Sequence, residues 1–324
     1  FYSQLPRKAY ASQDGLCCVD TLHRVTITGL EKNTTYFYRV LSQEVKELLP
    51  YRPVLGNIVS TDIWEKPLTF TTLDGRQETL SIVMINDIHG KNDLQKKLLE
   101  MAPPQNVDMV VFCGDMCNYI NKQSDIFTGF LDTSVGLFAS RKPFVYVRGN
   151  HETRGAYARN FFRYLAGPEG KFYYAFTYGP IRFIVLDSGE DKPDTDVEYS
   201  GLVDFDNYIL EQKEWLAREL ESPEFRAASF RVVLSHIPFG KGSWYGSERL
   251  RKQLLPLLES VRIDLMLSGH NHAFGFMDKG KVTAFPIIVN SNNSVLTMFG
   301  SKDLLKVQVK QIDGKVLLEK EFSK

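Results

Sequence analysis

Residues 143–152 read PFVYVRGNHE, a short apolar run followed directly by polar residues. The β-branched and aromatic side chains of this run favour a buried strand. Gly149 permits a tight turn, and Asn150, His151 and Glu152 then stand at the carboxyl end of the strand. Taken alone this pattern is an ordinary turn, because Asn and His are common loop residues.

The same arrangement occurs four more times in the chain. The runs LSIVMINDIHG, VDMVVFCGDMCN, FRVVLSH and IDLMLSGHNH all end in residues that can bind a metal. Those residues are, in chain order, Asp87 with His89, Asp115 with Asn118, His236, and His270 with His272. Of the six histidines, only His23 lies outside the five motifs. Five strand ends could therefore meet at one site.

The composition is that of a globular protein without a strong electrostatic bias. Lys plus Arg and Asp plus Glu number 39 each, so DNA, RNA and anionic membranes are disfavoured as partners. No run of about 18 apolar residues predicts a membrane-spanning helix. Four cysteines are too few for a disulfide scaffold, and the redox state of Cys17, Cys18, Cys113 and Cys117 stays open. Nothing in the sequence indicates an oligomeric state.

Two domains are expected from a length of 324 residues. Residues 1–75 contain alternating and β-branched segments, HRVTITGL and TTYFYRVLSQEV, and predict a small all-β domain. Residues 76–324 alternate apolar strands with helices, which predicts an α/β domain with a largely parallel sheet. Ligands bind beyond the carboxyl ends of such strands, where all five motifs fall. The last strands predict a second, more antiparallel sheet.

A long acidic loop follows one of the predicted strands. Residues 187–206 contain eight acidic residues and a single lysine. Either the loop is a solvated connection, or it is a mobile cover over the active site.

Seven side chains at the strand ends have the chemistry of a dinuclear metal site. Carboxylates and imidazoles suit divalent Zn, Mn or Fe, and no thiolate stands at a ligand spacing. One carboxylate can bridge two ions, which gives about four ligands to each. Such a pair generates a nucleophilic hydroxide and stabilises both oxygens of a phosphoryl displacement. The candidate ligands are Asp87, His89, Asp115, Asn150, His236, His270 and His272.

The ordered set DIH, GDMCN, GNHE, SH and GHNH resembles the calcineurin-like metallophosphoesterase superfamily, over roughly residues 80–290. The resemblance implies a four-layer α/β/β/α fold with two central sheets. It also implies one metal held by Asp87, His89 and His272, a second held by Asn150, His236 and His270, and Asp115 bridging the two. His151 would then act on the substrate, as the general acid that protonates the leaving alkoxide after a metal-bridging hydroxide attacks phosphorus.

The N-terminal segment TGLEKNTTYFYRV resembles the E to F corner of a fibronectin type III domain, with Tyr36 as the tyrosine-corner candidate. Such a domain ahead of the catalytic domain is similar to the arrangement in purple acid phosphatases. That subfamily has glycine where His89 stands and a metal-binding tyrosine where Asn118 stands. The sequence therefore combines a purple acid phosphatase-like architecture with an Asp-x-His, non-purple metal set.

Several neighbours of the motifs are candidate substrate contacts. Arg148 and Arg154 could hold phosphate oxygens or form surface ion pairs. Trp244 and Tyr245 could wall the substrate pocket or pack in the core. Asn118 could face the site or cap the following helix. Glu152 could orient a ligand histidine or start a helix.

The resemblance of the domain order to that of purple acid phosphatases favours a phosphate monoesterase. A phosphodiesterase would use the same metals, because the difference lies in the shape of the pocket. A binding or adhesion protein with a degenerate hydrolase domain is the alternative from another class. The fibronectin-like resemblance implies a secreted or periplasmic protein whose targeting segment is absent from this chain.

Overall fold

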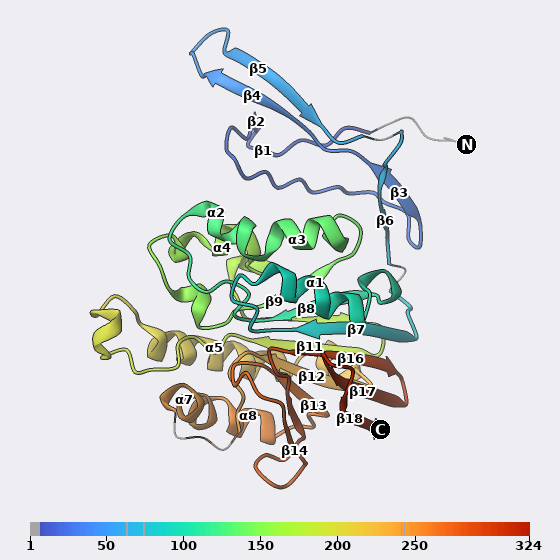
Figure 1. The fold of residues 1–324 in the computed structure, drawn as a ribbon, viewed down its shortest axis with the longest axis vertical. Helices are drawn as coiled ribbons and strands as arrows, with labels where there is room; N and C mark the ends of the chain where they lie inside the picture. The colour runs from blue at the N-terminus through green and yellow to red at the C-terminus, as the bar shows by residue number, and fades with distance from the viewer. Residues whose placement is uncertain (1–6, 63, 74, 241, 243) are drawn as a thin grey trace. The chain divides into compact units, whose positions relative to one another are not determined.

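The computed structural model describes residues 7–62, 64–73, 75–240, 242 and 244–324. The chain divides into two compact units, Phe1–Asp74 and Gly75–Lys324. Figure 1 shows the helices and strands of both units.

The first unit contains three antiparallel strand pairs among its described residues. These are β1 (Ser12–Gln13) with β2 (Leu16–Cys17), β3 (Thr35–Tyr38) with β6 (Leu68–Thr71), and β4 (Leu41–Glu47) with β5 (Val54–Ser60). The Tyr36 hydroxyl accepts a hydrogen bond from the Glu31 backbone N–H at 2.7 Å, the kind of contact made at a tyrosine corner. Its ring stacks on Phe70. The pairing leaves the apolar side chains of Leu55 and Ile58 largely exposed.

The second unit is built on two six-stranded sheets. The first sheet has the order β18-β17-β16-β7-β8-β9. Its parallel strands are β7 (Thr79–Ile85), β8 (Met109–Cys113) and β9 (Phe144–Val147). Its antiparallel strands are β16 (Ser294–Ser301), β17 (Leu304–Gln311) and β18 (Val316–Ser323), with β16 paired to β7.

The second sheet has the order β10-β11-β12-β13-β15-β14. Four parallel strands form its centre: β11 (Ile181–Leu186), β12 (Phe230–Ser235), β13 (Leu265–Ser268) and β15 (Ile287–Val289). The antiparallel strands β10 (Tyr174–Tyr178) and β14 (Gly275–Met277) form the edges.

The expectation that all five motifs follow strands of one largely parallel sheet is wrong. The motif strands β7, β8 and β9 lie in the first sheet, whereas β12 and β13 lie in the second. The reason is that β16 closes the edge of β7 by antiparallel pairing, so the two groups of parallel strands do not join. Each sheet is therefore mixed, and the antiparallel strands are divided between them.

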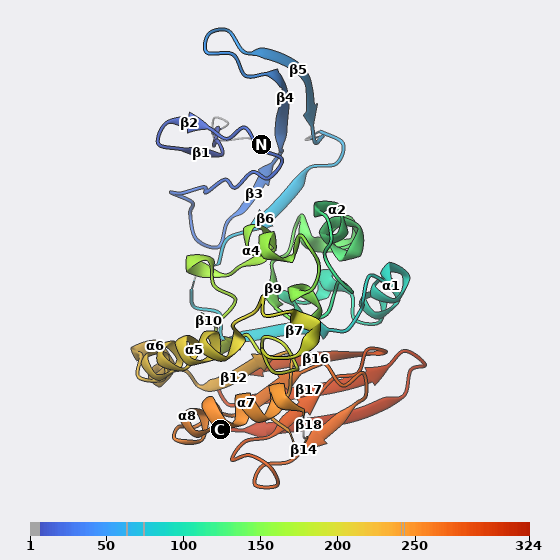
Figure 2. The same ribbon diagram turned by 90° about the vertical axis from the view of Figure 1, so that its left-hand side faces the viewer.

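An apolar core lies between the two sheets, and helices cover their outer faces (Figures 1 and 2). On β7, Ile82 and Met84 belong to the core between the sheets, whereas Val83 and Ile85 pack with the helices. This two-sided burial explains the uninterrupted apolar runs of the sequence. The helices on the first sheet include α1 (Asn92–Met101), α2 (Gln123–Ile126) and α3 (Asp132–Ser134), and α4 (Phe162–Leu165) lies nearby. The helices on the second sheet include α5 (Phe205–Leu220), α6 (Pro223–Ala227), α7 (Tyr245–Gln253) and α8 (Leu255–Glu259).

Within the described residues, no helix has the length and apolar character needed to cross a membrane. The four cysteines are free thiols, of which Cys113 and Cys117 are buried and Cys17 is exposed.

Candidate metal centre

The loops that follow five strands bring the predicted ligands together. Within each of three groups, ligand atoms lie no more than 4.8 Å apart: Asp87 with His89 and His272, His89 with Asp115 and His151, and Asp115 with His236 and His270. Because His89 and Asp115 each belong to two groups, the three groups form one continuous site.

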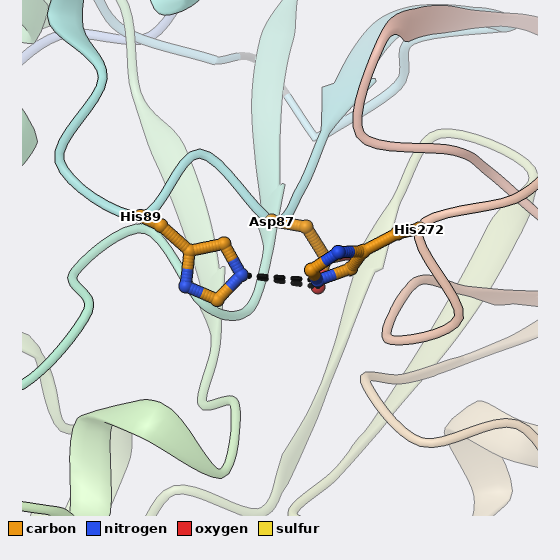
Figure 3. Close-up of side chains that lie close together, drawn as sticks. All are labelled: Asp87, His89 and His272. Atoms are coloured by element: carbon orange, nitrogen blue, oxygen red, sulfur yellow. Dashed lines mark hydrogen bonds and ion pairs between the residues drawn. The ribbon is translucent and has the colours of Figure 1, made fainter.

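The first group, called here the open group, consists of Asp87, His89 and His272 (Figure 3). The carboxylate oxygen Oδ1 of Asp87 lies 3.2 Å from Nε2 of His272 and 3.9 Å from Nε2 of His89. The two Nε2 atoms are 3.1 Å apart. The Asp87 carboxylate is fully buried, but the His272 side chain is 50% exposed, so solvent reaches this side of the site.

The buried group consists of Asp115, His236 and His270. His236 Nδ1 lies 2.7 Å from the Cys113 carbonyl oxygen, which makes Nδ1 the donor and turns Nε2 toward Asp115 Oδ2 at 3.1 Å. His270 Nδ1 lies 3.1 Å from Oδ1 of Asn150. The predicted amide ligand thus stands beside the buried group.

Three ligand atoms of the site are buried and have no hydrogen-bond partner among the described residues. They are Asp87 Oδ1, His236 Nε2 and His270 Nε2. His236 Nε2 is close to Asp115 but not aligned for a hydrogen bond. Each buried polar atom left unpaired costs about 1–3 kcal/mol, and a bound cation removes that cost. The residues therefore fit a dinuclear metal centre, and their oxygen and imidazole donors suit Mn, Zn or Fe.

The charges of the buried group are strongly coupled. Burial opposes ionisation of Asp115, but the charge of His236 and its close contact outweigh burial and lower the pKa of Asp115. Burial also opposes the charged form of His236, and Asp115 followed by Asp87 outweighs it, raising the pKa of His236 to about 10. Burial, followed by the charge of His236, lowers the pKa of His270 to about 3. Both shifts favour a protonated His236 beside an ionised Asp115, so a cation that binds at Nε2 would displace that proton.

Backbone strain is concentrated at the ligands. Of the ten described non-glycine residues with a positive φ, five are ligand candidates. Left-handed conformations are unfavourable for residues with a side chain, and strain of this kind clusters at functional sites. The five are Asp87 (φ 55°), His89 (52°), Asp115 (54°), His270 (72°) and His272 (55°).

The glycine that precedes a ligand in three of the motifs is required by close packing. A Cβ on Gly114 would lie 2.3 Å from His236 Nδ1, and one on Gly149 would lie 2.1 Å from Asp115 Oδ1. A Cβ on Gly269 would lie 2.8 Å from Asp87 Oδ2. These glycines let the motif loops approach one another.

The family model of the calcineurin-like phosphoesterases matches residues 80–274, which contain all seven ligand candidates. This chain belongs to the calcineurin-like phosphoesterase family. The family assignment made from the motifs is therefore confirmed. Members of this family use a dinuclear metal site.

Individual relatives of this phosphoesterase are distant. Purple acid phosphatase 22 of Arabidopsis thaliana is 24% identical over 273 residues, which are 78% of this chain and 53% of the relative. Purple acid phosphatase 23 of the same plant is 24% identical over 317 residues, 86% of this chain and 62% of the relative. The chain thus spans about half to three-fifths of their length.

Among solved structures, a dimetal phosphatase from Danio rerio superposes with a TM-score of 0.56 at 16% identity. The match covers 75% of this chain and 98% of the fish protein. At this identity the likeness concerns the fold alone, and it supports the mixed α/β architecture of the second unit.

His151 of the phosphoesterase faces the metal ligands with one ring nitrogen. Its Nδ1 lies 2.7 Å from the Asn118 carbonyl oxygen, so Nδ1 is the donor. The opposite nitrogen, Nε2, lies 4.0 Å from Asp115 Oδ2 and 3.3 Å from Nη1 of Arg154. The backbone carbonyl of Asn118 thereby sets the orientation of His151, and the side chain of Asn118 makes no part of this contact.

The two arginines that flank the central motif have different surroundings. Arg154 forms two hydrogen bonds to Glu190, at 2.9 and 2.8 Å, and turns Nη1 toward His151. Arg148 instead forms an ion pair of 2.6 Å with Asp187 and lies over the ring of Phe172. Arg148 is thus held within the protein, and Arg154 lies at the edge of the site.

The two aromatic candidates also separate. The Trp244 ring meets His270 edge-on with ring centroids 4.9 Å apart, and the residue is 53% exposed. The Tyr245 hydroxyl donates to the Asp206 carboxylate at 2.9 Å and so faces the acidic loop. Trp244 therefore borders the site.

The acidic loop is anchored to α7 by Arg249. The Arg249 guanidinium donates to the Glu190 carbonyl oxygen at 2.7 Å and to Asp206 Oδ1 at 3.1 Å. Asp187 and Glu190 are buried, so this part of the loop is not a solvated connection. It forms part of the wall that holds Arg154.

Glu152 has a role that the sequence did not specify. Its carboxylate accepts three backbone N–H bonds of 2.9 Å each, from Asp115, Cys117 and Gly149. It therefore ties two motif loops together and does not orient a ligand histidine, although it does lie in a 3-10 turn, His151–Thr153. Burial, followed by the charge of Asp115, raises the pKa of Glu152 to about 7.

Proposed function

We propose that this chain is a dinuclear metal-dependent phosphoesterase that hydrolyses phosphate monoesters. The proposal rests on the open and buried groups, which lie side by side. Both contain buried ligand atoms that have no hydrogen-bond partner among the described residues. One ion would be held by Asp87, His89 and His272, the other by Asn150, His236 and His270, with Asp115 shared between them.

The two ions, when bound, would supply an activated water and positive charge for the phosphoryl oxygens. The chain's own contribution is to fix the ligands before substrate arrives. Glu152 holds the loops of Asp115 and Asn150, and the Cys113 carbonyl fixes the tautomer of His236.

His151 is the proposed general acid. Because Nδ1 is committed to the Asn118 carbonyl, an imidazolium form of His151 would carry its transferable proton on Nε2, the nitrogen that faces Asp115 and the edge of the site. Nε2 of His151 would give this proton to the leaving alkoxide. Assisted departure matters most for alkyl esters, because an alkoxide is a far poorer leaving group than an aryl oxide.

Arg154 is the proposed contact for a phosphoryl oxygen. Burial opposes ionisation of the Glu190 carboxyl, but the hydrogen bond from Arg154 outweighs burial and lowers the pKa of Glu190. Arg154 and Glu190 therefore form a charged pair. Glu190 occupies Nε and Nη2 of the guanidinium, and Nη1 points toward His151. A phosphoryl oxygen near His151 would then accept from Nη1.

Monoester preference rests on similarity to proteins named purple acid phosphatases. A phosphodiesterase using the same site is the second candidate, and the exposed Trp244 ring offers a surface for a second ester group. A binding protein with a degenerate hydrolase domain is disfavoured by the complete ligand set.

The decisive experiment compares an aryl phosphate monoester with the matching diester. Protein stripped of metal is reconstituted with Mn, Zn or Fe, and bound metal per chain is measured alongside turnover. Two metals per chain and faster monoester hydrolysis are expected, whereas faster diester hydrolysis would favour the second candidate. Two bound metals with no hydrolysis of either substrate would overturn the enzyme assignment.

The architecture around this centre is also part of the proposal. The two helix-covered sheets are proposed to form the four-layer α/β/β/α phosphoesterase fold. The first unit is proposed to be part of a fibronectin type III-like domain, for which the Tyr36 to Glu31 contact is the support. By analogy with such arrangements, the protein is proposed to act outside the cytoplasm.

A further inference from the structure

A pair of buried amides lies directly behind Asp87. Asn86 Nδ2 donates to Asp87 Oδ2 at 2.6 Å and to the Asn290 carbonyl oxygen at 3.1 Å. In return, Asn290 Nδ2 donates to Asn86 Oδ1 at 2.8 Å. Both asparagines are fully buried.

The contacts fix the orientation of both amides. Rotating the Asn86 amide by half a turn would set its oxygen against the Asp87 carboxylate and its nitrogen against the nitrogen of Asn290. Asn290 is held in turn by Ser294, whose carbonyl accepts from Nδ2 at 3.0 Å and whose hydroxyl donates to Oδ1 at 2.7 Å. All four polar atoms of the amide pair therefore have partners, and a fully satisfied buried network is rigid.

The two carboxylate oxygens of Asp87 have different surroundings. Oδ2 accepts from Asn86 and from the His270 backbone N–H at 2.8 Å. Oδ1 has no hydrogen-bond partner among the described residues and lies 3.2 Å from His272 Nε2. One oxygen is thus held by the protein, and the other is turned toward the open group.

The pair also links the two sheets at the end where the ligands meet. Asn86 directly follows β7 of the first sheet, and Asn290 directly follows β15 of the second. The distance between ligands from different sheets, such as Asp87 and His272, depends on how these strand ends are joined.

We propose that Asn86 and Asn290 are positioning residues that present Asp87 to the metal of the open group through Oδ1 alone. The inference rests on the proposed dinuclear centre. Partners that orient a ligand commonly change metal affinity by about 10- to 100-fold. Loss of the amide pair should therefore weaken binding at the open group. The buried group should retain its ion, because the hydrogen bond from its His270 backbone N–H goes to Asp87 and not to the amides.

The test is Mn²⁺ binding by equilibrium dialysis to the metal-free full chain and to Asn86→Leu, which keeps the approximate volume and removes the amide. One of two sites is expected to weaken by about 10- to 100-fold, with turnover recovering at excess Mn²⁺. A merely structural role would lower turnover at every Mn²⁺ concentration. Asn207→Leu, a change of the same kind at an exposed position on α5, should bind Mn²⁺ as the wild type does.

Asn290→Ala provides an independent readout, because Asn290 acts on Asp87 only through Asn86. A smaller weakening of the same site is expected, and this variant decides the question if Asn86→Leu does not fold. Unchanged Mn²⁺ binding in a folded variant, or equal loss at both sites, would overturn the inference. Wild-type protein that binds no Mn²⁺, Zn²⁺ or Fe²⁺ would instead overturn the proposed function.

Discussion

The open and buried groups use similar side chains in different surroundings. The His272 side chain of the open group is 50% exposed, whereas the His236 side chain of the buried group is fully covered. Asp87 is oriented by a neutral amide network, and Asp115 is coupled to a histidine charge. Two sites of one centre are thus held by different means.

The difference in solvent exposure predicts how each half of the centre, the open group or the buried group, responds to the loss of a ligand. Water can replace a missing ligand where solvent reaches the ion, but it cannot easily do so among fully buried side chains. The open group should therefore exchange its metal more readily, and the buried group should act as the fixed part of the centre. Substitutions can test this contrast directly.

Asp115→Asn should have the largest effect, because Asp115 belongs to both the buried group and the group containing His89 and His151. The amide keeps the shape but removes the charge that two cations would share. We expect loss of most bound metal and a fall in turnover of at least about a thousand-fold. Metal analysis and steady-state kinetics measure both.

Asp93→Asn is the matched control, since Asp93 is exposed at the start of α1. It should bind metal and turn over substrate normally. Retention of two metals by Asp115→Asn would show that the halves do not share this carboxylate.

His151→Gln should have the next largest effect while leaving both halves loaded. We expect an alkyl phosphate to be hydrolysed about a hundred-fold more slowly, because general acid catalysis typically contributes 10²- to 10⁴-fold. An aryl phosphate, with its better leaving group, should be much less affected. Equal losses on the two substrates, at unchanged metal content, would contradict the proton-donor role.

The sequence predicted which side chains meet in the open and buried groups but not what holds them there. Apolar runs ending in Asp, Asn or His indicate the site, because within each sheet the parallel strands present their carboxyl ends at the same edge. The pairing of β16 with β7 is a long-range contact that no local pattern encodes. Asn86 and Asn290 stand 204 positions apart, and each alone has the character of a loop residue. Their partnership exists only once the two sheets are assembled.

The sequence also did not indicate which arginine lies at the edge of the site. In the sequence, Arg148 and Arg154 are both arginines close to the central motif. In the fold, Arg148 forms an ion pair with Asp187, whereas Arg154 contacts Glu190 and His151. Which arginine faces the site depends on where the acidic loop runs, and the anchoring of that loop to Arg249 is again a tertiary contact.

His272→Ala and His236→Ala address the contrast between the halves most directly. For His272→Ala we expect the Mn²⁺ concentration that gives half-maximal turnover to rise about 10- to 100-fold, with turnover largely restored at excess metal. His236→Ala removes a fully buried ligand and should not be rescued by excess metal. Rescue of both variants to the same extent would mean that burial does not distinguish the two halves.

Arg154→Met should act on the substrate and not on either half of the centre. Removing a hydrogen bond to a charged group costs about 1.5–3 kcal/mol, so kcat/KM should fall by roughly tenfold or more at unchanged metal content. Arg148→Met is the comparison, because it breaks an ion pair that does not face His151. It should lower thermal stability while leaving kcat/KM unchanged. If Arg148→Met changed kcat/KM without lowering the melting temperature, the assignment of the two arginines would be reversed.

Trp244→Ala should have the smallest effect and sharpens the comparison at its solvent side. The ring packs edge-on against His270 of the buried group, yet it is 53% exposed, so it can contact both a ligand and a bound substrate. Aromatic contacts contribute roughly 0.5–1.5 kcal/mol, which corresponds to a rise in KM of about two- to tenfold for an aryl ester. Phe299→Ala, an exposed aromatic on β16, should leave KM unchanged. An equal rise in KM for aryl and alkyl esters would show that Trp244 supports His270 and does not touch the leaving group.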